Sequence, residues 1–294
     1  MDLRKLRYLL TVAEEKHFTR AAERLYISQP SLSQQIKHLE DELGTALIER
    51  SSRLVRLTAA GELLCQHARH IFNELQDAQT ALAELAHLER GTLAIGCVQT
   101  VNAYLMPRLL SAFVAQHPNI ALSVEEMPAA EIEARLLEGT LQIGLGFSPP
   151  SQPAIEAEVL FDEELVLYVA ADHPLAGCTQ LELRQLEGVP LALLPRTFCT
   201  RRIWEACAQQ AALTPKVMVE LNTVQGLLSL VSHSRLASVL PQLAQSLAQN
   251  LCAIRLVLPT PRRSIALLWR RNAFKCAASR AFAHLLKSTP LGIG

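Results

Sequence analysis

The 294-residue sequence lacks the features that mark secreted, membrane-embedded or disulfide-stabilised proteins. No apolar run approaches the roughly 18 residues that would span a bilayer. Charged side chains throughout the first twenty residues argue against a secretory signal peptide. The seven cysteines form no CxxC pair, which excludes a zinc ribbon and disfavours a disulfide framework. We therefore expect a cytoplasmic protein with no membrane partner.

Motifs of catalysis and of metal binding are also missing. There is no GxSxG, P-loop or GxGxxG pattern. The acidic runs 125–126 and 162–164 could suggest paired acid–base carboxylates, but charges at strand ends and in loops explain them. His67 and His70 lie near Cys65 without a complementary ligand cluster, so we expect a solvated helix face and no metal. The sequence predicts a non-enzymatic protein with no bound cofactor.

Charge of one sign is not in excess, because Lys+Arg and Asp+Glu both number 28. The total charge therefore gives no indication of a polyanionic partner, and any nucleic-acid binding has to rest on a local motif. Half of the residues are hydrophobic and 19% are charged, which supports a sizeable core. At this length two or more domains are expected.

The N-terminal fifth of the chain has the periodicity of short helices followed by a small hairpin. Apolar residues at helical spacing predict a first helix to about Lys16 and a second that begins with Thr19 as its N-cap. Ser28 can cap a third helix, with Pro30 in its first turn, where a missing N–H costs nothing. Gly44 is expected to end that helix.

Two short helices joined by a tight turn, with small residues at their crossing, are typical of a helix-turn-helix. The inward apolar residues of the third helix leave Gln29, Ser33 and Gln34 outside, where their side chains can hydrogen-bond base edges. Lys37 and Arg53 can meet phosphates or enter the minor groove. The alternative is a three-helix packing domain whose polar face is only solvated.

A long helix is predicted next, capped by Thr58 and running to about Leu88. At 1.5 Å per residue it would be roughly 45 Å long. Its apolar residues repeat with alternating spacings of four and three, which is typical of a coiled coil between subunits. The alternative is a single amphipathic helix lying on its own domain. The seam consists of Leu64, Ala68, Ile71, Leu75, Ala78, Leu82 and Leu85.

The remaining residues alternate between predicted strands and helices of about ten residues. This pattern indicates parallel sheets with helices on both faces, divided into two lobes. Because ligands of open α/β sheets bind at the carboxyl ends of strands, we expect a small-molecule site between the lobes. The predicted strands are 92–98, 120–126, 141–147, 165–170, 190–194, 216–221, 236–240, 252–258 and 264–270. The predicted helices include 104–116, 130–137, 202–212, 224–233 and 243–248.

The sequence closely resembles the LysR-type transcriptional regulators. The resemblance rests on the segments 19–40, 47–50, 57–61, 91–96, 113–118, 172–175 and 239–241. It implies an α plus α/β fold: a winged helix-turn-helix, a long linker helix and a two-lobed effector domain like periplasmic binding proteins. The implied domains are 1–58 for DNA binding, 59–89 for the linker (dimerisation) helix and 90–294 for effector binding. Lobe I would comprise about 90–162 and 266–294, and lobe II about 163–265.

The resemblance also implies site residues. For DNA binding these are Gln29, Pro30, Ser31, Ser33, Gln34, Lys37, Arg50 and Arg53. For effector binding they are Gln99, Thr100, Val101, Pro128, Phe147, Phe198, Thr200, Arg202 and Asn222, although ordinary loop packing is the alternative for each. Ile48 stands where the family often has Phe, and Ser52 where it often has Gly, so the wing contacts are less secure than the helix contacts.

The implied partners are double-stranded DNA, a small-molecule co-inducer, further copies in a homodimer or homotetramer, and RNA polymerase. Along the whole chain the sequence is most similar to cyanate-operon regulators, a likeness that does not identify the effector. A third hypothesis, a ligand-binding or enzymatic α/β protein with an accessory helical domain, is disfavoured by the recognition helix and the heptad linker.

A redox-sensing regulator on the same scaffold is the second hypothesis. Cys199 and Cys207 stand eight apart, and peroxide-sensing members of the family use two cysteines in this region. A thiol beside Arg201, Arg202 and a helix start would have a lowered pKa and react faster with oxidants. Against this, the spacing is one residue short, and a buried, unreactive Cys207 is the commoner case.

Overall fold

The computed structural model describes residues 1–49, 55–85 and 91–289. The chain divides into two compact units, Met1–Thr80 and Ala81–Gly294. Within the described residues, no helix combines the length and the apolar character that crossing a membrane requires.

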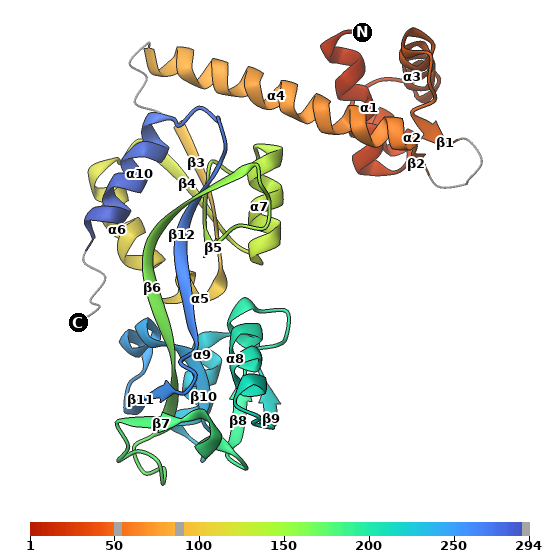
Figure 1. The fold of residues 1–294 in the computed structure, drawn as a ribbon. Coiled ribbons are helices and arrows are strands. Elements are labelled where there is room, and N and C mark those ends of the chain that lie inside the picture. Colours follow the sequence, from red (N-terminus) through yellow and green to blue (C-terminus); the bar gives the residue numbers. More distant parts are fainter. Residues whose placement is uncertain (50–54, 86–90, 290–294) are drawn as a thin grey trace. The chain divides into compact units, whose positions relative to one another are not determined.

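The first unit is a three-helix domain with a small hairpin (Figure 1). Its elements are α1 (Leu3–Glu15), α2 (Phe18–Arg24), α3 (Gln29–Leu43), β1 (Ile48–Glu49) and β2 (Arg56–Leu57). The predicted start and end of α3 are confirmed: the Ser28 hydroxyl accepts a hydrogen bond from the Ser31 N–H, and Gly44 has a left-handed φ of 67°. The N-cap predicted for α2 is wrong. The His17 ring nitrogen caps this helix and accepts from the Thr19 N–H at 3.2 Å.

A buried carboxylate ties the hairpin to α3. Glu40 lies on the inner side of α3, and its Oε1 accepts hydrogen bonds from the backbone N–H groups of Leu47 (2.8 Å) and Ile48 (3.2 Å). These two amides begin the hairpin, in which Ile48 pairs with Leu57. The position of the hairpin relative to α3 is therefore fixed by hydrogen bonds as well as by apolar packing.

The long helix α4 (Ala59–Leu85) begins as predicted, because the Thr58 hydroxyl accepts from the Gly61 N–H at 3.1 Å. Gly61 is required here, since a Cβ would stand 2.1 Å from the Leu47 carbonyl oxygen. Along the heptad seam Ala68 is buried in the first unit, whereas Ile71 and Leu75 are each 40% exposed. The seam therefore packs internally at its start and leaves apolar side chains open further along. The side chain of Leu85 lies outside the described part of the chain.

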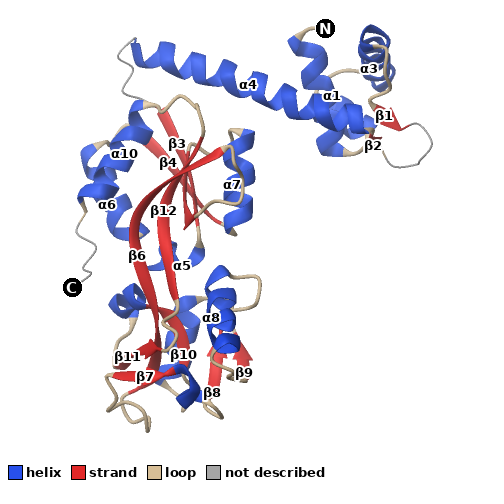
Figure 2. Cartoon of the chain, in the orientation of Figure 1, coloured by secondary structure: helices blue, strands red, loops and turns tan. Residues whose placement is uncertain are grey.

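The first lobe of the second unit is a sheet covered by helices on both faces (Figure 2). β3 pairs in parallel with β4 and β5, while β12 runs antiparallel to β5. Its elements are β3 (Gly91–Cys97), α5 (Gln99–Tyr104), α6 (Met106–Gln116), β4 (Ile120–Glu126), α7 (Ala129–Glu138), β5 (Ile143–Ser148), β12 (Arg262–Arg270) and α10 (Ala277–Ser288).

The second lobe is built on the far half of one very long strand, β6 (Ile155–Ala170). β10 and β11 pair antiparallel with that half, and β8 pairs in parallel with β9. The other elements are β7 (Gln180–Glu182), η1 (Leu183–Leu186), β8 (Pro190–Leu193), α8 (Cys199–Gln210), β9 (Lys216–Glu220), α9 (Val224–Ser232), β10 (Ser238–Pro241), η2 (Gln242–Leu247) and β11 (Leu251–Val257).

Strands β6 and β12 connect the two lobes, as Figure 1 shows. From Ile155 to Glu164, β6 pairs with β12; from Leu165 onward it pairs with β10 and β11. The prediction of parallel sheets is wrong at this point, because β10, β11 and β12 all run antiparallel to β6. The acidic run 162–164, which we expected at a strand end or in a loop, lies inside β6.

Candidate DNA-binding face and ligand pocket

The outer face of α3 carries the side chains that the sequence proposed for DNA contact. The apolar face of the helix is buried through Leu32, Ile36 and Leu39. This burial fixes the rotation of the helix, so the opposite face is presented to solvent. The exposed side chains there are Gln29, Pro30, Ser31, Ser33, Gln34 and Lys37. The two predicted wing residues, Arg50 and Arg53, lie outside the described residues.

The turn between α2 and α3 adds an exposed aromatic residue that the sequence reasoning treated only as part of a turn. Tyr26 has a left-handed φ of 56° and is 96% exposed. A nearby cation is less available, because Arg24 donates to Glu14 (2.9 Å) and Glu15 (3.0 Å). These two carboxylates, Glu15 foremost, raise the pKa of Arg24. Tyr26 therefore joins the exposed polar set at the start of α3.

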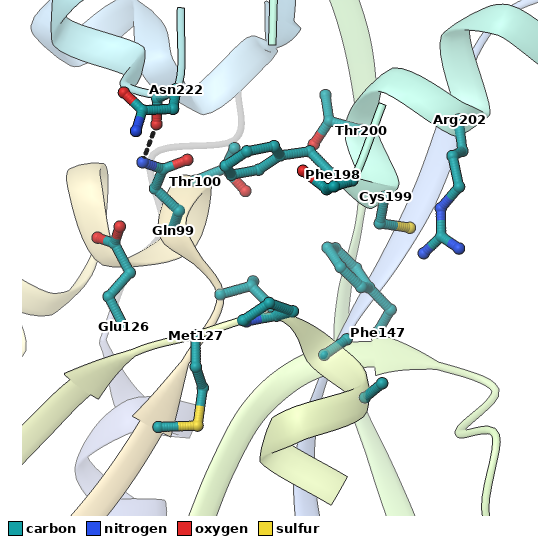
Figure 3. Close-up of a pocket in the computed structure, with 15 residues that line it drawn as sticks. Gln99, Thr100, Glu126, Met127, Phe147, Phe198, Cys199, Thr200, Arg202 and Asn222 are labelled. Carbon is teal, nitrogen blue, oxygen red and sulfur yellow. Dashed lines mark hydrogen bonds between the residues drawn. The ribbon is translucent and has the colours of Figure 1, made fainter. Parts of the chain in front are cut away.

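In the second unit a cavity of about 380 Å³ lies between the two lobes (Figure 3). Eight of the nine predicted effector residues line it: Gln99, Thr100, Pro128, Phe147, Phe198, Thr200, Arg202 and Asn222. The ninth, Val101, is fully buried in the hydrophobic core. The sequence did not place seven further lining residues there as effector contacts: Val98, Glu126, Met127, Ala129, Ala130, Thr197 and Cys199.

Strand direction explains why these segments meet. β3 and β4 are parallel and in register, with Cys97 opposite Glu126, so the residues after both strands emerge at one sheet edge. The Met127 N–H donates to the Cys97 carbonyl at 3.1 Å and holds the two ends together. α8, which follows β8 of the second lobe, begins at Cys199 and supplies the opposite wall.

A buried ion pair borders the cavity, where the paired strands β6 and β12 pass from one lobe to the other. Arg263 and Glu163 are paired across these strands, and each side chain is only 1% exposed. Glu163 Oε2 accepts from Arg263 Nε at 2.9 Å and from Nη2 at 2.7 Å. It also accepts from the Tyr104 hydroxyl at 3.0 Å. Burial would lower the pKa of Arg263, but Glu163 outweighs this effect and raises it, so the guanidinium stays protonated.

The same guanidinium forms hydrogen bonds to both lobes beside the cavity. Arg263 Nη1 donates to the Thr100 hydroxyl oxygen at 2.9 Å and to the Thr200 hydroxyl oxygen at 2.8 Å. Thr100 belongs to α5 in one lobe and Thr200 to α8 in the other, and both are buried. The Phe147 ring packs on the guanidinium, with its centroid 5.3 Å from Cζ. One buried cation therefore fixes two hydroxyls that border the cavity.

A second hydrogen bond joins the two lobes beside the cavity. The Gln99 side-chain amide of the first lobe donates to the Asn222 backbone carbonyl of the second, as the dashed line in Figure 3 shows. The Gln99 Oε1 atom is buried without a hydrogen-bond partner among the described residues. Such an unsatisfied oxygen is costly. It could accept a hydrogen bond from a bound molecule.

The two cysteines considered for redox sensing lie on one helix and are not positioned to bond. Residues eight apart in α8 are separated by about 12 Å along the axis, whereas a disulfide needs Cα atoms about 4.4–6.8 Å apart. Burial raises the pKa of Cys199, although Arg263 and Arg202 oppose this effect. Burial also raises the pKa of Cys207. The lowered thiol pKa expected from the sequence is therefore wrong in direction.

Comparisons with known proteins identify the family. The family described as "Bacterial regulatory helix-turn-helix protein, lysR family" matches residues 3–62, and "LysR substrate binding domain" matches residues 86–290. The chain belongs to the LysR family of transcriptional regulators. These LysR regulators are DNA-binding proteins that are not enzymes, and both parts expected from the sequence, the helix-turn-helix and the two-lobed effector domain, are confirmed.

Among LysR-family relatives, the hydrogen peroxide-inducible genes activator of Dickeya chrysanthemi is 32% identical over 274 residues, covering 92% of this chain and 90% of the relative. The Hca operon transcriptional activator HcaR of Escherichia coli is 39% identical over 189 residues, covering 64% of each. A full-length OxyR variant from Pseudomonas aeruginosa has a TM-score of 0.76 at 30% identity, covering 99% of this chain and 96% of that one.

A second solved structure, full-length CbnR in complex with its target DNA, has a TM-score of 0.64 at 27% identity, with coverage of 98% and 99%. The comparisons do not support the narrower likeness to cyanate-operon regulators that the sequence suggested.

Proposed function

We propose that this LysR regulator binds operator DNA through α3 and is controlled by a small molecule held in the cavity between its effector lobes. The observation that carries the proposal is the set of lining side chains, which both lobes contribute and which Arg263 joins through Thr100 and Thr200. A ligand that touches both lobes can favour one lobe arrangement over another. A tenfold preference corresponds to about 1.4 kcal/mol of coupling free energy.

The regulator is further proposed to act as a symmetric dimer joined through α4, with pairing of dimers into a tetramer. The exposed apolar seam residues Ile71 and Leu75 support this assembly, because a monomer would leave them in water. RNA polymerase would be the further partner if the regulator activates transcription. Leu75→Asp places a charge in the seam, and we expect it to weaken dimerisation and operator binding together. Sedimentation showing an unchanged assembly for this variant would refute the dimer proposal.

Footprinting tests the DNA-binding part directly. The full-length protein is incubated with DNA upstream of its own gene, with and without a panel of small metabolites. We expect a protected, sequence-specific site whose extent or affinity changes with one class of metabolite. Failure to protect any segment over a scrambled duplex would contradict the operator assignment, and protection insensitive to every metabolite would contradict the ligand-controlled switch.

Redox sensing is a second candidate, because several relatives are peroxide-inducible activators and Cys199 lines the cavity. The geometry of α8 opposes it, since a bond between Cys199 and Cys207 would require the helix to unwind. Treatment with hydrogen peroxide, followed by an operator-binding assay, separates the two candidates. We expect unchanged binding. A peroxide-dependent change that disappears in Cys199→Ser would promote the redox candidate over the ligand-controlled one.

The ionisation of Cys199 gives an independent check. Because burial raises the pKa of this thiol above its ordinary value of 9.0, the reactive thiolate is scarce at neutral pH. The rate of alkylation by iodoacetamide should increase with pH and still be increasing above pH 9.0. Mass spectrometry of the modified peptide assigns the rate, with Cys199→Ser as control. A rate that reaches its plateau below pH 7 would indicate an activated thiolate and contradict this prediction.

A further inference from the structure

We propose that Arg263 is the specificity-determining residue of the cavity: it holds the hydroxyls of Thr100 and Thr200 as a pair of hydrogen-bond donors, and the site thereby selects the carboxylate of a small monocarboxylic acid with an apolar body. This inference rests on the proposed ligand-binding function and names the ligand class for that same site.

The first step concerns the guanidinium. Arginine has five N–H donors in a fixed planar fork. Nε and Nη2 of Arg263 donate to Glu163, and Nη2 also lies 3.4 Å from the Tyr104 hydroxyl. The two hydrogens of Nη1 remain, and two acceptors are in reach, Thr100 Oγ1 and Thr200 Oγ1. The ion pair thus locks one side of the fork, and the other side presents one N–H to each lobe.

The second step concerns the hydroxyl protons. Each threonine oxygen accepts a hydrogen bond from a cation, which polarises its O–H bond and makes that hydroxyl a better donor. Among the described residues neither hydroxyl proton has an acceptor, although Thr100 is 2% exposed and Thr200 is 3% exposed. Both residues line the cavity, and Figure 3 shows them at its upper end beside Phe198. The available acceptor is therefore a molecule bound in the cavity.

The third step is the chemistry of that molecule. Two donors side by side match the two oxygens of a carboxylate, whereas an ammonium group at the same place would face two hydroxyl oxygens that already accept from Arg263. Arg202 lines the same cavity and can balance one negative charge, whereas Glu126 lines it from the other lobe and would repel a second. Phe147, Phe198 and Met127 supply apolar surface for the remainder of the ligand.

The test uses the full-length protein and isothermal titration calorimetry without DNA. The probes are benzoate, benzamide and benzamidine, which share one shape and carry negative, zero and positive charge, together with hexanoate and hexanamide. We expect the two carboxylates to bind and each amide to bind at least tenfold more weakly, with benzamidine weakest. Equal affinity of an acid and its amide overturns the proposal, as does the absence of binding by both carboxylates.

Substitutions then assign the selectivity to Arg263. In Arg263→Lys the cation facing Glu163 is kept, but a single ammonium loses the planar fork, so the acid-to-amide ratio should fall at least tenfold. The matched control is Arg262→Lys, next on the strand, where the arginine is exposed and pairs with Glu164. An unchanged ratio in folded Arg263→Lys, or an equal fall in both variants, overturns the assignment.

A second pair of variants keeps the proposal testable if Arg263→Lys does not fold. Thr100→Val and Thr200→Val remove the hydroxyls with little change of volume, and each should lower the acid-to-amide ratio. Thr140→Val is the control, because Thr140 also accepts from an arginine, Arg135 at 3.3 Å, but lies outside the cavity. If both hydroxyls can be removed without changing the ratio, the donor pair does not select the ligand and the inference is wrong.

The failure of this inference can be distinguished from the failure of the proposed function. Calorimetry without DNA measures only the ligand class, so an amide that binds as tightly as its acid leaves a ligand-controlled regulator intact. A footprint that responds to no metabolite leaves the cavity's carboxylate preference measurable. Oxidation of Cys199 by peroxide with no carboxylate binding would refute the inference and favour the redox candidate.

Discussion

The DNA-binding face and the ligand cavity use polar side chains in opposite ways. On α3 the candidate contact residues come from one helix, and they are exposed. At the cavity the hydroxyls of Thr100 and Thr200 are buried, and they come from different lobes. The first site offers solvated groups that can adapt to a base edge, whereas the second offers groups already fixed before a ligand arrives. Fixed groups would lose little conformational freedom on binding, so under the proposed function the cavity would favour one chemical class.

The two sites also differ in the interactions that hold them in place. α3 is held by apolar packing on its inner face, and its polar face can be changed without touching the core. The cavity depends on Arg263 and Glu163, which are both part of the site and part of the interior. Substitutions at the cavity should therefore affect folding and binding together, and substitutions on α3 should affect binding alone.

The largest expected effect is the loss of the buried cation. Arg263→Ala leaves Glu163 buried without its partner and should lower the free energy of unfolding by about 3–5 kcal/mol. Urea denaturation followed by tryptophan fluorescence measures it, because Trp204 and Trp269 both belong to the second unit and so report on its unfolding alone.

Arg262→Ala is the matched control for that experiment, and it should change stability far less. Replacing both partners by apolar residues, Arg263→Met with Glu163→Leu, should recover much of the loss, since no buried charge is left unpaired. A loss below about 1 kcal/mol in Arg263→Ala would contradict the view that this ion pair is part of the interior.

The candidate DNA-binding residues of α3 could be predicted from the sequence because they belong to one helix and follow from its periodicity. Leu32, Ile36 and Leu39 mark the buried face, and the exposed polar residues follow from their spacing alone. The ends of α3 were also predictable, since the signals at Ser28 and Gly44 are local. The cavity residues next to strand ends, such as Thr100 and Pro128, came from strand order and from the family resemblance.

The buried ion pair was not predictable in the same way. Alternation along a strand implies that one of Glu163 and Glu164 faces inward, but three consecutive acidic residues at 162–164 lack the apolar alternation that predicts a strand. Glu163 and Arg263 stand 100 positions apart, and only the register of β6 against β12 brings them together. The first half of β6 was missed for the same reason, because its polar residues are satisfied by partners far along the chain.

The next largest expected effect tests base recognition by the exposed face of α3. Gln34 is exposed on α3, and a glutamine that makes a bidentate base contact contributes about 1–3 kcal/mol of discrimination. Gln34→Ala should weaken binding to the operator by that amount and leave binding to a scrambled duplex nearly unchanged. Fluorescence anisotropy with both duplexes measures the ratio. Equal weakening on the two would show that Gln34 does not read sequence.

Lys37 tests the electrostatic part of the same face. Its side chain is exposed, and an ammonium that meets a phosphate carries no sequence information. Lys37→Ala should weaken operator and scrambled duplex by the same factor, and the slope of log affinity against log salt should become shallower by about 1. A salt titration of both duplexes provides the measurement. A selective loss on the operator alone would move Lys37 into the base-reading group.

The smallest expected effect concerns Glu164, which is the neighbour of the buried Glu163 on β6 but pairs with exposed arginines. Glu164 accepts from Arg255 and from Arg262, each at 2.8 Å, but both arginines are more than half exposed. Glu164→Gln should therefore cost at most about 1 kcal/mol at pH 7. The Arg255 hydrogen bond holds the pKa of Glu164 below its ordinary 4.5.

A lowered pKa in the folded state means that the stabilisation is present above the unfolded value and disappears as pH falls through the folded value. The difference between Glu164→Gln and the unsubstituted chain should therefore be greatest near neutral pH, and it should decline as the pH falls below 4.5 toward the lowered pKa of the folded state. Urea denaturation at three pH values tests this. The neighbouring Arg263→Ala variant should be destabilised several-fold more at pH 7, because it leaves a buried carboxylate without its partner. If both variants lost stability equally at pH 7, burial would not explain why the Glu163–Arg263 pair contributes more than the ion pairs of Glu164.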